Sequence, residues 1–185
     1  TLTGATDNSS RSSRGAPTEL RIPPFTGTSA SVIYTVAAGD ASNDLTVTQL
    51  ALGSGATLVC PGQDSRPVKL AIPAGQNLGD SKDIAIDGTV PTVTSIVRQA
   101  PTAEITNAST ATFAVTFSED VTGVSAANFA LAATGGQSVA SVLSVSSVSG
   151  GTVWAVTVGT VDHAVGVVSV DLVDTVDIVD AAGNT

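Results

Sequence analysis

The chain has 185 residues, a net charge of −9 and only 3% aromatic residues, and it contains no methionine. Binding to nucleic-acid phosphates needs a basic surface, so the acidic balance argues against a nucleic-acid partner. No apolar run approaches the length of a membrane-spanning helix, so we expect no such helix in this sequence. The length suits one large domain or two small ones, and a core built from Val, Leu, Ile and Ala favours β-sheet over a helix bundle.

Residues 1–30 are predicted to form an irregular N-terminal arm, because they are rich in Ser, Gly, Thr, Pro and Arg and the stretch TDNSSRSSRGAPTE shows no apolar periodicity. Within this arm, a short strand could lie near Leu20–Ile22, before Pro23. From residue 31 onward, apolar residues alternate with polar ones, which is the period of a half-buried strand. We assign residues 31–88 to a first, partial or atypical module. The strands predicted in it lie at residues 32–36, 45–47, 68–72 and 84–86.

The boundary between two modules is predicted between residues 88 and 89. Asp87 and Gly88 form a turn sequence, and Pro91 favours an extended conformation in the residue before it. Residues 89–185 then form the second module. Its predicted strands lie at residues 113–117, 129–131, 154–158 and 168–172, with a helical turn within 125–130 and two short, kinked strands within 139–148.

Short strands separated by frequent turn sequences are typical of a sandwich. A weak internal repeat adds to this pattern, because TFAVTFSEDV from Thr112 parallels SVIYTVAAGD from Ser31. The segment VDIVDAAGNT ending at Thr185 parallels GATLVCPGQDS ending at Ser65, and the first module continues beyond that point. We therefore predict an all-β chain of two tandem immunoglobulin-like β-sandwich modules, the second of which lacks its last strand.

Several motifs resemble the bacterial immunoglobulin-like repeats of large secreted adhesins and biofilm-matrix proteins. They are VTFSEDVTGVSAANFAL (115–131), TVWAVTV (152–158), VDAAGNT (179–185) and the junction-like IDGTVPTVTSI (86–96). The segment CPGQDSR, from Cys60 to Arg66, departs from the pattern. The resemblance implies a secreted protein of the bacterial cell surface or extracellular matrix that acts as a stiff spacer or fibre segment. Its expected partners are neighbouring repeats of the same chain or copies of itself.

The chain is predicted not to be an enzyme. Its one histidine, His163, could form an acid–base pair with Asp162, but a solvent-exposed hairpin is the simpler interpretation. The one cysteine, Cys60, cannot form an internal disulfide and has no second histidine to activate it. Trp154 and Tyr34 alternate in phase with valines, which favours core packing over a sugar-binding platform.

Acidic residues from distant segments are expected to meet at one pole of the second module. In an immunoglobulin-like sandwich, the start of the first strand, the loop between the second and third strands and the last hairpin loop share a pole. Ca²⁺ binds six to eight oxygen ligands, and related repeats often carry calcium between modules. We predict a structural Ca²⁺ at the junction, with the ligands Asp87, Glu119, Asp120, Asp180 and Asn184.

The alternative to calcium is that each of these residues caps its own turn. Equivalent but weaker candidates in the first module are Asp40, Asp44 and Asp64.

Two other functions remain open. The chain could be a self-assembling filament or surface-layer subunit that uses donor-strand exchange, with residues 1–30 as the donor arm. It could instead be a carbohydrate-binding module, which would need exposed aromatic rings. The chain has one Trp and one Tyr.

Overall fold

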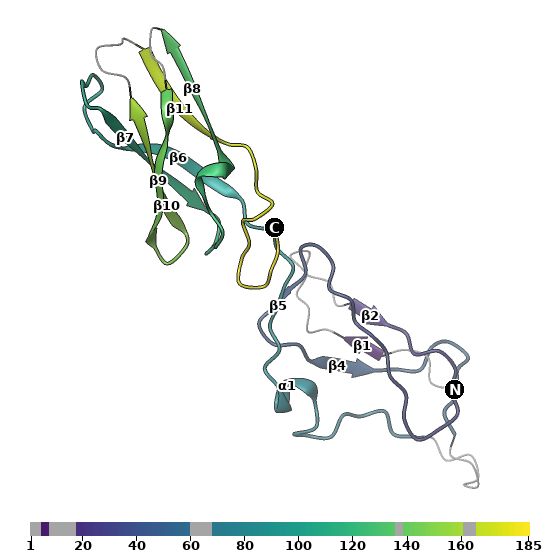
Figure 1. The fold of residues 1–185 in the computed structure, drawn as a ribbon. Helices are drawn as coiled ribbons and strands as arrows, with labels where there is room; N and C mark the ends of the chain where they lie inside the picture. The colour runs from purple at the N-terminus through teal and green to yellow at the C-terminus, as the bar shows by residue number, and fades with distance from the viewer. Residues whose placement is uncertain (1–4, 8–17, 60–67, 136–138, 161–165) are drawn as a thin grey trace. The chain divides into compact units, whose positions relative to one another are not determined.

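The computed structural model describes residues 5–7, 18–59, 68–135, 139–160 and 166–185. The chain divides into two compact units, Thr1–Thr89 and Val90–Thr185. The described residues form antiparallel strands with almost no helix, which confirms the all-β prediction (Figure 1).

The first unit contains small sheets and one short helix. A three-stranded sheet has the order β2-β1-β4, and a second sheet pairs β3 with β5. These elements are β1 (Ala5–Asp7), β2 (Thr18–Leu20), β3 (Ala41–Ser42), β4 (Val47–Leu50), α1 (Leu78–Ser81) and β5 (Ile86–Asp87). The N-terminal arm is therefore not wholly irregular. Backbone pairing of β1 with β2 and β4 requires no apolar periodicity in the arm.

The strands predicted at residues 32–36 and 68–72 are wrong, since neither segment is a strand. Alternation produces a strand only where one face can be buried. Among the described residues of the first unit, the only buried hydrophobic side chain is that of Ile22. The alternating apolar residues described in this unit are therefore not buried together in one hydrophobic core.

The side chain of Asn77 joins the short helix α1 to strand β4. Its amide oxygen accepts hydrogen bonds from the backbone N–H groups of Leu78 at 2.8 Å and Val47 at 3.0 Å. Its amide nitrogen donates to the carbonyl of Val47 at 2.7 Å, and Asp80 completes a capping box by accepting from the Asn77 N–H. One polar side chain thus positions the helix against the sheet.

The second unit consists of two antiparallel sheets (Figure 1). The first sheet has the order β6-β7-β10-β9, and the second pairs β8 with β11. The elements are β6 (Val93–Ala100), β7 (Thr110–Phe117), the 3-10 turn η1 (Ala126–Asn128), β8 (Phe129–Gly135), β9 (Val139–Ser149), β10 (Val153–Thr160) and β11 (Gly166–Leu172). The strands predicted at 113–117, 129–131, 154–158 and 168–172 are confirmed.

Strand β9 corrects the prediction of two short strands with a kink. It is one strand of 11 residues whose register against β10 shifts. Val142 pairs with Val158 and Val145 pairs with Val156, so three steps along β9 match two steps along β10. This bulge explains the spacing of three between the valines.

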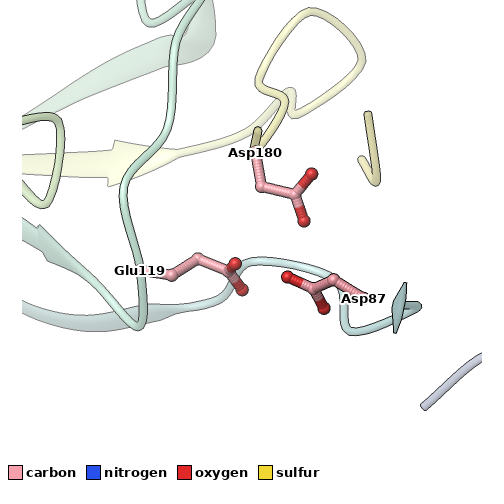
Figure 2. A group of neighbouring side chains, drawn as sticks. All are labelled: Asp87, Glu119 and Asp180. Carbon is pink, nitrogen blue, oxygen red and sulfur yellow. The ribbon is translucent and has the colours of Figure 1, made fainter. Parts of the chain in front are cut away.

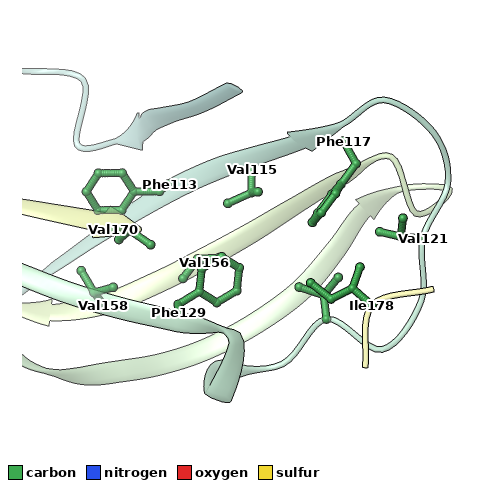
Figure 3. Close-up of a cluster of buried hydrophobic side chains, with 10 residues drawn as sticks. Phe113, Val115, Phe117, Val121, Phe129, Val156, Val158, Val170 and Ile178 are labelled. Carbon is green, nitrogen blue, oxygen red and sulfur yellow. The ribbon is translucent and has the colours of Figure 1, made fainter. Parts of the chain in front are cut away.

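One hydrophobic cluster lies between the two sheets (Figure 3). Strand β7 contributes alternate residues, as does β10, and side chains from β8, β11 and the connecting loops complete the cluster. Its buried members are Phe113, Val115, Phe117, Val121, Val124, Phe129, Val156, Val158, Val170 and Ile178. Burying a side chain of this size stabilises a fold by about 1.5–3 kcal/mol, so this cluster is the main source of stability in the unit.

Two backbone hydrogen bonds join the segment after β11 to the loop after β7. The N–H of Thr122 donates to the carbonyl of Val179 at 2.8 Å, and the N–H of Val179 donates back at 3.1 Å. Beside this bridge, Gly123 has a φ of +83°, and a Cβ there would lie 1.8 Å from the carbonyl oxygen of Asp177. Only glycine fits this close approach of two backbones.

We expect Gly123→Ala to destabilise the second unit strongly, because it adds a steric clash with Asp177 to the cost of a positive φ. Gly183→Ala is the matched control, since Gly183 has a φ of +92° but a Cβ added there would have no atom within 4 Å. The control should lose about 1–3 kcal/mol of unfolding free energy, and Gly123→Ala clearly more, in urea denaturation. Equal losses would contradict the close contact.

Candidate metal site

The loop after β11 turns around the carboxylate of Asp180. One oxygen of this carboxylate accepts the backbone N–H groups of Ala182 at 2.8 Å, Gly183 at 2.7 Å and Asn184 at 2.9 Å. The other oxygen accepts the side-chain amide of Asn184 at 2.8 Å. The Asp180 side chain is buried, with 6% of the residue surface exposed. Asp180 and Asn184 therefore close the loop in the way that an Asx turn does.

These hydrogen bonds keep Asp180 ionised. Burial of the carboxyl group acts to raise its pKa, but the bonds from Asn184, Ala182 and Gly183 outweigh burial and lower the pKa below its ordinary value. At neutral pH, the loop therefore carries a fixed and largely buried negative charge.

Glu119 lies beside Asp180 in the second unit. Its half-buried side chain follows β7, and a carboxylate oxygen of Glu119 lies within 4.8 Å of one of Asp180 (Figure 2). The neighbouring Ser118 is tied to Thr92, because the Ser118 N–H donates to the Thr92 carbonyl at 2.8 Å and the Ser118 hydroxyl accepts the Thr92 N–H at 2.9 Å. Two carboxylates so close repel each other unless a proton or cation lies with them.

The remaining predicted ligands have other partners. Asp120 accepts a hydrogen bond from the hydroxyl of Thr152 and lies against the glycine turn between β9 and β10. Asp87, the third residue drawn in Figure 2, belongs to the first unit, where it ends β5 and accepts the N–H of Thr89 at 3.0 Å. Within the second unit, the structure thus brings Glu119, Asp180 and Asn184 together.

The candidate metal ligands of the first unit that the structure describes, Asp40 and Asp44, contact residues of their own unit. Asp40 accepts the Tyr34 hydroxyl at 2.6 Å and the Ala37 N–H at 2.8 Å. The bond from Tyr34, followed by that from Ala37, lowers the pKa of Asp40. The carboxylate of Asp44 lies against the α1 residue Gly79. Asp64 lies outside the described residues, as do Cys60, Asp162 and His163.

Neither expected core aromatic forms an open platform. Trp154 is half-buried against the hydrophobic cluster, as predicted, and its indole N–H donates to the Gly151 carbonyl at 2.7 Å. Tyr34 is half-buried, and its hydroxyl is bound to Asp40. Their polar groups are therefore engaged within the protein.

Asn128 is a buried polar residue that the sequence analysis missed. Its side-chain oxygen accepts from the N–H of Ser125 at 2.7 Å and from the hydroxyl of Ser125 at 3.0 Å. Its amide nitrogen donates to the carbonyl of Asp174 at 3.0 Å. The signal in the sequence is the spacing of Ser125 and Asn128, which resembles a capping box before a short helical turn.

No family model, curated protein or solved structure matches the chain. In the part of the chain that the structure describes, no helix combines the length and apolar character needed to cross a membrane. A proposal for function therefore depends on strand order and on the geometry of the second unit.

We predict that acid destabilises the second unit through Asp180. Because the pKa of Asp180 is lowered on folding, its contribution is present above the unfolded-state pKa of about 3.9 and is lost as the pH falls through the lower folded-state pKa. Asp180→Asn keeps an oxygen for the backbone donors and should show a shallower loss of unfolding free energy with acidification. The control Asp171→Asn changes an exposed carboxylate of β11. Its unfolding free energy should fall with acidification as steeply as that of the wild type. Identical slopes for all three proteins would contradict the prediction.

Proposed function

We propose that the chain is a structural, non-catalytic segment of an extracellular bacterial adhesin or matrix protein, built from immunoglobulin-like modules and acting as a stiff spacer or fibre segment. The observation that carries this proposal is the strand order of the second unit. In an immunoglobulin sandwich, strands A, B, E and D form one sheet in that order, and C, F and G form the other. Taken along the chain as A to F, strands β6 to β11 give the order A-B-E-D in one sheet and C-F in the other.

The short connection between the units supports a stiff spacer. Strand β5 ends at Asp87 and β6 begins at Val93, so five residues separate the strands. One of them is Pro91, whose φ is fixed, and another is Thr92, which is already hydrogen-bonded to Ser118. Little chain therefore remains to act as a flexible linker.

A calcium ion at this pole is the second part of the proposal. Glu119 and the ionised Asp180 supply two carboxylates, and the amide oxygen of Asn184 is a third oxygen close to them. Backbone carbonyls or water would complete the six to eight ligands of Ca²⁺. The role of the ion would be to offset carboxylate repulsion and to limit motion at the junction.

Calcium should raise the melting temperature of the full chain, and chelation should lower it. For a site of extracellular affinity, about 10⁻⁴–10⁻³ M, a tenfold to hundredfold excess of Ca²⁺ stabilises by about 1.4–2.7 kcal/mol, which corresponds to several degrees. Glu119→Gln should abolish this difference. Asp120→Asn should keep it, since Asp120 is bound to Thr152. Equal melting with and without Ca²⁺ in the wild type would refute the calcium site.

Single-molecule stretching tests the mechanical role itself. We expect the second unit, Val90–Thr185, to unfold in one cooperative event that releases about 300 Å of contour length, since an extended residue spans about 3.3–3.6 Å. Extension without a force peak would show that the unit does not bear load and would contradict the role as a spacer.

A further inference from the structure

The four-stranded sheet of the second unit has an outer face that points away from the hydrophobic cluster. On β7, Phe113, Val115 and Phe117 enter the cluster, so the residues that alternate with them point outward. Strand pairing places the outward residues of neighbouring strands side by side, and each of these paired residues is Ser, Thr, Ala, Gly or Val. The central row across the sheet is Val97, Ala114, Ala155 and Ser146.

The acidic residues of the second unit lie outside this sheet. From Val90 to Thr185, the sequence contains eight acidic residues and one basic residue, Arg98, so the unit carries a net charge of −7. None of the eight lies in β6, β7, β9 or β10. Arg98 pairs with Phe113, whose side chain enters the cluster, so Arg98 is not among the outward residues. The paired residues of the outer face therefore carry no charge, although the unit is strongly acidic.

This distribution of charge favours a second copy of the chain as the occupant of the outer face. Two second units that each carry −7 repel each other, and the repulsion is strongest where carboxylates meet. Contact between two outer faces brings no carboxylate of these strands against another. The other sheet differs, because the exposed Asp171 lies on β11. Of the two sheets, the four-stranded one thus offers the surface on which two copies meet with less repulsion.

The outer face is also flat and large enough for a protein interface. Side chains no larger than Val allow two sheets to pack about 10 Å apart, as the sheets of a sandwich do. Four strands about 4.8 Å apart, with residues about 3.3 Å apart over the eight-residue strands β6, β7 and β10, cover about 500 Å² per copy and about 1,000 Å² per pair. Specific interfaces begin at about that size. The area therefore predicts a weak and reversible dimer.

Two hydroxyl groups on the outer face are hydrogen-bonded within it. The hydroxyls of Thr112 and Thr157 lie 3.1 Å apart and bond to each other. Burying a hydroxyl costs free energy unless it is hydrogen-bonded, so this bond lowers the cost of removing water from the face. The side chain of Val97, a residue with 54% of its surface exposed, would leave water at the same time, which stabilises the contact.

We propose that the outer face of the four-stranded sheet packs against the same face of a second copy of the chain, across a two-fold axis. A contact between identical faces closes as a dimer and does not grow to higher oligomers. This interaction goes beyond the proposed spacer role, because it joins two spacers side by side.

Three variants of the full chain test this contact. Ala155→Glu adds a carboxylate to the central row of the face, and Ser146→Glu adds one to the same row at an exposed position of the edge strand β9. The control Ala132→Glu adds the same charge at an exposed position of β8, in the other sheet. Circular dichroism and thermal melting establish that each variant folds, and Ser146→Glu carries the test if Ala155→Glu does not fold.

Sedimentation velocity of the full chain then measures dimerisation. Over about a hundredfold range of concentration, the wild type and Ala132→Glu should pass from monomer to dimer and grow no further. Ala155→Glu and Ser146→Glu should each weaken dimerisation at least about tenfold, because like charges then face each other across the contact. Raising the salt from about 0.1 M to about 1 M shortens the Debye length from about 10 Å to about 3 Å. The wild-type dimer should therefore become tighter, since the repulsion between the acidic units is screened.

A wild type that stays monomeric at every concentration and in both salts would overturn the proposal. Dimers of Ala155→Glu or Ser146→Glu that are as tight as those of Ala132→Glu would show that the contact lies elsewhere. A dimer that weakens in high salt would depend on attraction between acidic and basic residues, and growth beyond the dimer would exclude a closed contact, so either result overturns the proposal. Stretching of the second unit is independent of these results, so the failure of dimerisation and the failure of the spacer role remain distinguishable.

Discussion

The second unit depends on one interaction, the burial of alternate side chains of β7 and β10 against the β8–β11 sheet. Val115, Val156 and Val158 have no exposed surface, and they are the centre of a cluster that contains only three aromatic rings. Small β-branched residues leave little volume for a thick core, so loops must contribute to it. Val121 and Ile178 do so from two loops that are also joined by backbone hydrogen bonds. The loop that carries Asp180 is therefore held by the core.

This dependence explains how much of the fold could be predicted from the sequence. In the second unit, alternation indicated β7, β8, β10 and β11 correctly, because a shared core buries one face of each of these strands. In the first unit, the same pattern at residues 32–36 and 68–72 produced no strand, since Ile22 alone is a buried hydrophobic residue among those described. Periodicity reports which face of a strand is apolar, but it does not report whether another layer covers that face. The continuous strand β9 was missed because its bulge is defined by the partner strand β10.

The pole of the second unit was predicted in part, for a related reason. Asp180 and Asn184 belong to one short loop, and Glu119 follows the end of a regularly alternating strand, so topology alone suggested their proximity. The partner of Asp120 was not predictable, because it is Thr152, positioned by the turn between β9 and β10.

The bulge in β9 has a consequence for how this protein can change during evolution. Between Val142 and Val145, strand β9 has one residue more than the opposed part of β10, and β9 lies at the edge of its sheet. A deletion of one residue there would restore plain pairing and leave both valines opposite their present partners. The same deletion within β7 or β10 would turn every following side chain to the opposite face and expose the core. Length variation among descendants of this sequence is therefore expected to collect in β9, while the two central strands keep their length.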